Sequence, residues 1–326
     1  MMYRPPIVRA AVGLLLLAYC APVRADAPKK EAPPKKAEVK KAAPAKYLRI
    51  RRNDKGEPIA METSIVRFVP ASGEGDLTVD LIGAVHVGDA TYYKQLNRQM
   101  EQYDVLLYEL VAPPGTRIPK GGRKNDSAFG MVHKVMKFVL DLESQTEKID
   151  YTKKNFVHAD LSPKQMAEAI KERGDDGITI ALGVAADMLR QQNLQATQQA
   201  KKDPAKKQKE AEDFDITSIL DPDGAVKLKR IMAEQFEKAD DGLGATLNNI
   251  LIADRNKACL KVFQQEMAKG KKKIGIFYGA AHMPDFEKRL KEEFGLKRQN
   301  EQWIEAWDLE DKERDVLIDL IKALAK

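Results

Sequence analysis

The chain is poor in cysteine, in histidine and in long apolar runs. Only two of its 326 residues are cysteines, which excludes a disulfide framework and any zinc cluster built from several thiolates. The apolar run at residues 10–19 spans about ten residues and is too short to cross ~30 Å of hydrocarbon as a helix. Apolar residues still make up 43% of the chain, which excludes disorder throughout and suffices for a sizeable core.

Excess positive charge is also lacking once the N-terminal tail is set aside. The formal net charge of the chain is +6, but residues 1–46 hold ten Lys/Arg against three Asp/Glu. The rest of the chain holds 45 Lys/Arg and 46 Asp/Glu and is close to neutral. A domain that binds nucleic acid carries a basic patch, so we expect no nucleic-acid partner.

The N-terminal residues read as a targeting segment. Arg4 and Arg9 supply the positive charge that precedes the short apolar run, and residues 23–25 offer a small-residue cleavage site. This pattern predicts a secretory signal peptide over residues 1–25 and an exported protein, periplasmic or extracellular. The alternative is a lipoprotein anchored through Cys20.

Residues 26–46 are dominated by Lys, Ala and Pro and contain nothing that could pack into a core. We expect a disordered, extended linker here, ahead of a folded domain over residues 47–326. Its positive charge leaves open a second interpretation, a weak contact with an anionic membrane or wall surface.

Strand and helix patterns alternate in the folded part. Residues 78–85 predict a buried strand, 90–103 a helix with Asp89 as N-cap, and 104–111 a second apolar strand. This order favours a parallel pair of strands joined by a right-handed crossover. Further strands are expected at 47–51, 64–69, 272–278 and 302–309, and further helices at 127–142, 163–173, 178–200, 228–238, 246–269, 285–294 and 315–325.

One element occurs twice, 196 residues apart. An apolar strand ends in Gly83-Ala-Val-His86 in the first copy and in Gly279-Ala-Ala-His282 in the second. Each copy has an Asp three residues after the His, a candidate helix N-cap, and opens a helix. We therefore predict an α/β fold with a mixed, largely parallel sheet, flanking helices and a helical insertion at about 127–270 between the two strand–GxxH–helix elements.

The repeated element points to a site. Ligands of open α/β sheets bind beyond the carboxyl ends of the strands, where His86 and His282 are expected, and the two glycines let the backbone approach closely. Glu109 lies near the end of the neighbouring strand, where a carboxylate is costly to bury without a partner. Two imidazoles and one carboxylate match the ligand set of catalytic zinc sites and also suit Mn or Co.

Arg255 is the fourth candidate, because it lies within the apolar stripe of the helix at 246–269. A guanidinium that faces inward needs an anionic partner or a substrate oxygen. Two simpler interpretations stay open: Glu109 and Arg255 could form a structural ion pair, and the histidines and Glu109 could act as general acid and base without a metal.

These motifs resemble the TraB/GumN (TraB/PrgY/Tiki) superfamily over roughly residues 78–309. The resemblance rests on the two Gly-x-x-His elements, the Glu between them and the Arg255–Asn256 pair on a helix before the second element. It implies an α/β core related to erythromycin-esterase-like and haem-binding ChaN-like proteins. It also implies a Mn- or Co-dependent hydrolase with the metal on His86, Glu109 and His282, with Arg255 nearby. Asp160 matches a further family position, and His158, beside it, is a possible additional ligand.

We therefore expect an exported, peptidase-like metallohydrolase that acts on a peptide or small molecule. One divalent ion, Mn or Co by resemblance and Zn by ligand type, would activate water, and Arg255 would stabilise the oxyanion. Glu109 could instead serve as the base. Two alternatives remain: a secreted protein that binds haem, a metal or a peptide without turnover, and a metal-free esterase that uses His86 as its base.

Overall fold

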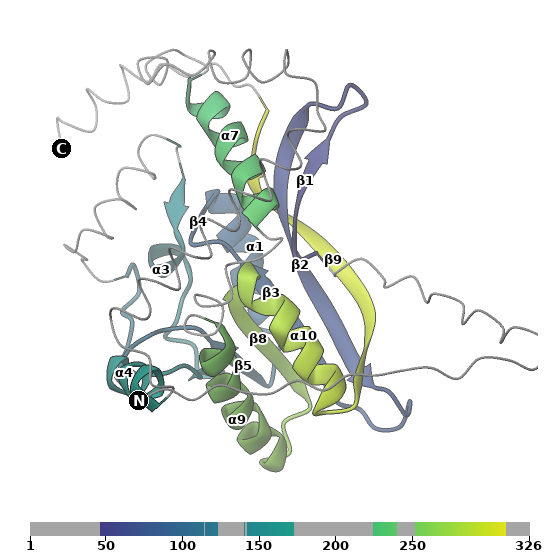
Figure 1. The fold of residues 1–326 in the computed structure, drawn as a ribbon, viewed down its shortest axis with the longest axis vertical. Helices are drawn as coiled ribbons and strands as arrows, with labels where there is room; N and C mark the ends of the chain where they lie inside the picture. The colour runs from purple at the N-terminus through teal and green to yellow at the C-terminus, as the bar shows by residue number, and fades with distance from the viewer. Residues whose placement is uncertain are drawn as a thin grey trace, which may run out of the picture. The chain divides into compact units, whose positions relative to one another are not determined.

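A computed structural model shows an α/β protein with a mixed, largely parallel seven-strand sheet and flanking helices, which confirms the predicted fold class (Figure 1). The structure describes residues 46–113, 115–122, 140, 142–172, 224–239 and 252–310. The predicted signal peptide, nearly all of the linker, the helices expected at 178–200 and 315–325, and most of that at 127–142 lie outside these residues. No helix among the described residues is long and apolar enough to cross a membrane.

One part of the sheet is antiparallel and joins the two ends of the folded chain. Its centre is the long strand β2 (Pro58–Pro70), which follows β1 (Leu48–Arg52) after a turn at Gly56, where φ is +83°. Strand β9 (Leu296–Asp308) runs antiparallel along β2 for almost its whole length, as Figure 1 shows. The sheet therefore takes strands from both ends of the domain, as the sequence predicted.

The other part of the sheet is parallel and contains both repeated elements. In order across the sheet its strands are β3 (Thr78–Ala84), β8 (Lys273–Gly279), β5 (Val105–Tyr108) and β7 (Phe156–His158). The predicted direct pairing of β3 with β5 is wrong, because β8 lies between them and pairs in parallel with both. The middle residues of β8 are apolar and buried, and a strand of this kind is favoured in the interior of a parallel sheet, with a neighbour on each side.

Helices cover both faces of this sheet (Figure 1). Helix α1 (Ala90–Met100) lies behind β3. On the front face, α9 (Asp254–Ala268) packs against β5 and α10 (Met283–Glu292) against β3 and β9. Cys259, on α9, is fully buried, in agreement with a core thiol. The remaining elements are β4 (Val87–Gly88), β6 (Glu143–Ser144), α3 (Gln145–Lys148), α4 (Pro163–Glu172), α7 (Gly224–Ala239) and η3 (Ala280–His282).

The range predicted as a helical insertion is not purely helical, because β7 falls within it and pairs with β5. The two predicted aspartate caps also differ from expectation. Asp89 occupies the N-cap position of α1, but its carboxylate accepts a hydrogen bond from the Asp308 N–H, 2.6 Å away, and does not cap the helix. Helix α10 begins at Met283, so Asp285 lies inside its first turn.

Candidate functional site

The carboxyl ends of the parallel strands bring most of the predicted site residues together. In the sheet, Ala84 of β3 pairs with Gly279 of β8, and Tyr108 of β5 pairs with Phe277. His86 follows β3, Glu109 follows β5, and η3 carries His282 directly after β8. Because the strands are parallel, all these side chains start from the same edge of the sheet.

Arg255 on α9 is held between two carboxylates. Its Nη2 donates to Glu109 Oε1 at 2.6 Å and to Asp160 Oδ2 at 2.7 Å, and its Nε donates to Asp160 Oδ1 at 3.0 Å. The exposed fractions of the three side chains are 9% for Arg255, 11% for Glu109 and 0% for Asp160. The expectation that an inward-facing Arg255 needs an anionic partner is therefore met twice.

Backbone groups hold both carboxylates in place. The N–H groups of Leu110 and Leu161 donate to Asp160 at 2.9 and 2.7 Å, and the Gly279 N–H donates to Glu109 Oε2 at 2.7 Å. These donors are backbone N–H groups near the ends of the strands, so they do not depend on which side chains these residues carry. The two carboxylates are thus fixed by the fold itself, and Arg255 completes their hydrogen bonding.

Hydrogen bonds fix the protonation pattern of His282. The Asn256 amide nitrogen donates to the His282 carbonyl at 3.0 Å and to the Asp285 carboxylate at 2.9 Å. Its oxygen must therefore be the atom 2.7 Å from His282 Nδ1, and the hydrogen of the ring lies on Nδ1. The lone pair on Nε2 then faces Arg255 Nη1 at 3.4 Å and Glu109 Oε1 at 3.6 Å.

We call Glu109, Asp160, Arg255, Asn256 and His282 the Arg255 cluster. Burial raises the pKa of the Glu109 carboxyl, but His282, the Arg255 guanidinium, His86 and the Gly279 N–H together lower this pKa to about 2. Burial lowers the pKa of His282 to about 4, and the Arg255 charge acts in the same direction. At neutral pH the cluster therefore pairs an ionised Glu109 with a neutral His282 ring.

His86 differs from the other candidates because it is exposed. Its carbonyl accepts a hydrogen bond of 2.9 Å from the Gln145 N–H, which fixes the backbone after β3. Its ring lies near enough to the Arg255 cluster to help lower the pKa of both Glu109 and His282. The two repeated histidines therefore share one neighbourhood, one facing solvent and one buried.

His158 is placed differently. Its Nε2 lies 2.6 Å from the Leu110 carbonyl, so this nitrogen carries the hydrogen, and its ring packs on the edge of Tyr108. Nε2 therefore has no lone pair to offer a metal, and only Nδ1 of His158 is left with one. His158 thus supports the chain next to Glu109, whereas Asp160, two residues later, joins the cluster directly.

The predicted His86–Glu109–His282 metal site is only partly formed. Two ligands at ~2.1 Å from a tetrahedral zinc lie ~3.4 Å apart, and His282 Nε2 and Glu109 Oε1 lie close to that separation, at 3.6 Å. However, Arg255 Nη2 already donates to the same Glu109 oxygen. Within the described ranges, no three His, Cys, Asp or Glu side chains are arranged to hold one metal ion. In this arrangement the residues do not fit a bound metal.

The two glycines of the repeated element have different surroundings. A Cβ added at Gly83 would lie 3.3 Å from the Ser64 carbonyl oxygen and 3.6 Å from the Cα of Ala280, so β3 packs too closely there for a larger residue. A Cβ at Gly279 would meet only Glu109 at 3.5 Å and His282 at 3.8 Å, which is ordinary contact. Of these two positions, only 83 is packed so tightly that an added methyl group would have to displace a neighbouring atom.

Sequence reasoning missed Gln145, which contacts His86, and Tyr151, which contacts Gln145. Gln145 is 5% exposed and its Nε2 donates to the Tyr151 hydroxyl at 2.9 Å, while its Oε1 is buried without a hydrogen-bond partner. Tyr151 packs on Tyr108, the residue before Glu109, with ring centroids 5.1 Å apart. No motif marked this pair, because Gln145 comes near His86 only through the pairing of β4 with β6.

Comparisons with protein families, with curated proteins and with solved structures find no match for this chain. The resemblance to the TraB/GumN superfamily therefore stays a prediction from the motifs.

Proposed function

We propose that this protein is an exported hydrolase whose reacting centre lies where His86 borders the Arg255 cluster. One observation carries the proposal: a solvent-facing imidazole lies beside a buried guanidinium, an ionised carboxylate and a neutral imidazole. Export rests on the N-terminal sequence pattern, and the hydrolase class also draws on the motif resemblance. Site and sequence together favour cleavage of an ester or peptide bond.

The described geometry supports acid–base chemistry without a metal step. His86 would accept a proton from water as the water oxygen attacks the substrate carbonyl carbon, and the imidazolium would return that proton to the leaving group. Glu109 stabilises the imidazolium through its negative charge, which its low pKa maintains. The Arg255 guanidinium supplies the positive charge that an oxyanion requires, and its two carboxylates keep it in place.

A second candidate, a metallohydrolase, draws on one specific observation. His282 donates its Nδ1 hydrogen to Asn256 and keeps a lone pair on Nε2, which here accepts from Arg255 Nη1 at 3.4 Å; a histidine held through its other ring nitrogen is typical of metal sites. His86, Glu109 and His282 would hold the ion, with Mn or Co favoured by resemblance and Zn also suited to these ligands. A bound ion would supply Lewis-acid activation of water and carbonyl. This candidate requires Arg255 to move away from both the Glu109 oxygen and His282 Nε2.

A substrate screen with and without chelation separates these functions. The purified full chain is assayed on fluorogenic peptide and ester libraries, before and after removal of metal by a chelator, and its metal content is measured. The acid–base proposal predicts hydrolysis that survives chelation. Loss of activity on chelation and its return with Mn would establish the second candidate instead. If no substrate in either library is cleaved under any condition, the hydrolase proposal fails and a binding protein becomes the better explanation.

A further inference from the structure

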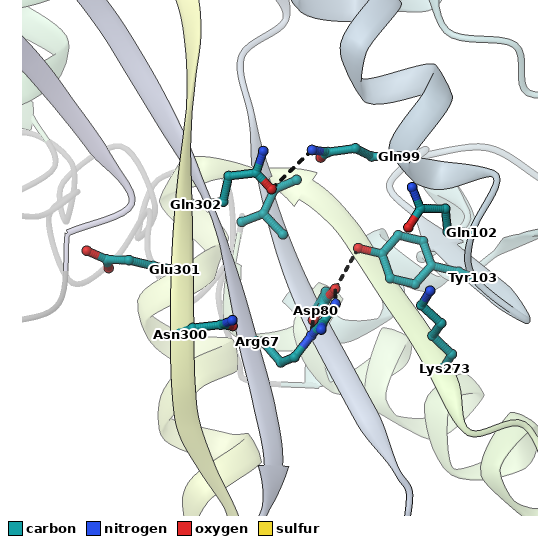
Figure 2. A pocket seen from close by; sticks show the side chains of 10 residues that line it. Arg67, Asp80, Gln99, Gln102, Tyr103, Lys273, Asn300, Glu301 and Gln302 are labelled. Carbon is teal, nitrogen blue, oxygen red and sulfur yellow. Dashed lines mark hydrogen bonds and ion pairs between the residues drawn. The ribbon is translucent and has the colours of Figure 1, made fainter.

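A polar cavity lies on the α1 side of the sheet, away from the Arg255 cluster. It has a volume of about 260 Å³ and is lined by Asp80 near the start of β3 and by Lys273 at the start of β8 (Figure 2). The Arg255 cluster gathers at the opposite, carboxyl ends of the same strands. Asp80 and His86 are six residues apart, which corresponds to roughly 20 Å along an extended chain.

Strand register places the floor of this cavity on one face of the sheet. Arg67 of β2 pairs with Asp80 on one side and with Asn300 of β9 on the other. Paired residues project to the same face, and so does Gln302, two residues beyond Asn300. Figure 2 shows Glu301, the residue between them, pointing away from the others.

An ion pair between the partly exposed Arg67 and the buried Asp80 forms the centre of the floor. Asp80 is 3% exposed and accepts hydrogen bonds from Arg67 Nε and Nη2, both at 2.8 Å, and from the Tyr103 hydroxyl at 2.8 Å. The Tyr103 ring can lie this low because Gly275 has no side chain; a Cβ there would come within 3.0 Å of the ring. Asp80 therefore neutralises Arg67 and has its hydrogen bonds satisfied.

Lys273 contributes a positive charge that adds to backbone hydrogen bonds in lowering the pKa of the nearby Asp104 carboxyl but forms no ion pair among the described residues. It precedes Gly275 by two residues, shares its face, and holds its ammonium 6.0 Å from the Tyr103 ring centre. Asp104 accepts a hydrogen bond from the backbone N–H of Lys273. The Glu301 carboxylate, on the other face of β9, is bonded to Arg298 and Trp303. Within the part of the chain that the structure describes, no carboxylate lies at ion-pair distance from the Lys273 ammonium.

Carboxamides line the wall opposite the charges. The Gln99 Nε2 donates to Gln302 Oε1 at 3.1 Å, and the two side chains meet across the cavity in Figure 2. Gln99 Oε1 is buried and has no hydrogen-bond partner. If both amides were turned around, the Gln99 nitrogen would be the atom left without a partner, so one polar end stays unsatisfied either way. A buried polar atom without a partner is destabilising, and a turn of the Gln99 side chain toward the cavity would let a ligand satisfy it.

We infer that this cavity binds a small carboxylate that carries an amide group next to it, such as an acylated amino acid or the C-terminal residue of a peptide. The carboxylate pairs with the Lys273 ammonium. The neighbouring amide bonds to the unsatisfied end of Gln99. The ligand is expected to carry both groups, because the cavity offers the Lys273 ammonium, which forms no ion pair among the described residues, and a wall of carboxamides.

Titration of the full chain with three small probes tests this inference. N-acetylglycine carries the carboxylate and the amide, N-acetylglycinamide carries the amides without the charge, and inorganic phosphate carries charge alone. Binding is followed by NMR chemical shifts of the 15N-labelled protein. We expect N-acetylglycine to bind at least about tenfold more tightly than either of the other two, the value of one charge-assisted hydrogen bond. The inference is overturned if N-acetylglycinamide or phosphate binds as tightly as N-acetylglycine, or if N-acetylglycine does not bind.

Two neighbouring lysines provide matched variants. Lys273→Gln removes the charge inside the cavity, whereas Lys272→Gln removes an equal charge that is paired with Asp76 at 2.6 Å and does not line the cavity. Lys273→Gln should weaken N-acetylglycine binding about tenfold or more, and Lys272→Gln should leave it within about twofold. Similar losses in both variants, with the amide spectra showing both folded, would mean that general surface charge attracts the probe, and the inference would be wrong.

Discussion

Removal of Arg255 should destabilise the fold by an amount that depends on pH. Arg255→Met keeps the length and apolar stem of the side chain but leaves Glu109 and Asp160 buried without their cation. Loss of one partner from a buried ion pair costs about 3–5 kcal/mol. We expect the lower end of that range, ~3 kcal/mol, because three backbone N–H groups still donate to the two carboxylates.

Urea unfolding followed by tryptophan fluorescence measures this loss, because Trp307 is fully buried and reports on the core. Arg51→Met is the matched control. Arg51 also bridges two carboxylates, Glu62 at 3.0 Å and Glu305 at 2.7 Å, but its side chain is 42% exposed. A surface pair of this kind contributes about 0–1 kcal/mol.

The pH dependence of the stability lost in Arg255→Met shows whether the loss comes from the missing positive charge or from altered packing. The Arg255 guanidinium helps to lower the pKa of the Glu109 carboxyl, so without it this pKa rises in the folded state and acid protonates Glu109 more readily there. The stability difference from wild type should therefore shrink as the pH falls below about 5. A loss no larger than that of Arg51→Met, or one that stays constant with pH, would refute the assignment of Arg255 as the counterion of two buried carboxylates.

Two further predictions concern single residues of the site. The pKa of His282 is about 4 in the folded protein and 6.5 in the unfolded chain, so between these pH values the unfolded chain binds one more proton than the fold. The free energy of unfolding should therefore fall as the pH drops from 6.5 to about 4, by an amount of the order of 3 kcal/mol. His282→Gln should flatten this part of the stability profile, and an unchanged slope would contradict a neutral buried His282. Gly83→Ala should cost about 1–3 kcal/mol in urea unfolding, because the added methyl meets the Ser64 carbonyl, whereas Gly279→Ala should stay within about 1 kcal/mol of wild type. Equal effects of the two substitutions would show that the packing at Gly83 is not tight.

The sequence predicted the fold class well because apolar strands and their neighbours are local signals. It could not predict which strands are adjacent. The strand–helix–strand pattern at 78–111 favoured a direct pair, yet β8 enters from a segment about 170 residues later and separates β3 from β5. The central place of β8 follows from its burial and from its pairing with a strand on each side. Such pairing depends on the whole sheet, so no local sequence pattern predicts it.

Site residues that belong to a sequence motif could be predicted, whereas residues that join the site only through contacts with distant partners were harder to predict. The Gly-x-x-His repeat and the inward position of Arg255 pointed to His86, His282 and Arg255, which the structure places near one another. Asp160 carried only a weak signal, although it makes two hydrogen bonds to Arg255. Asp285 was expected as a helix cap and instead binds the amide that orients His282. Short polar side chains serve as caps or as tertiary partners, and sequence spacing does not separate these roles.

The most direct test of the central claim is the loss of kcat/KM in His86→Ala on the best substrate from the screen. General acid–base catalysis contributes about 10²- to 10⁴-fold, so we predict a loss in that range with unfolding free energy unchanged, because His86 is exposed. His158→Gln is the matched control: its amide still donates to the Leu110 carbonyl, and its activity should stay within about threefold of wild type. Full activity in His86→Ala would contradict the account and place the reacting centre elsewhere.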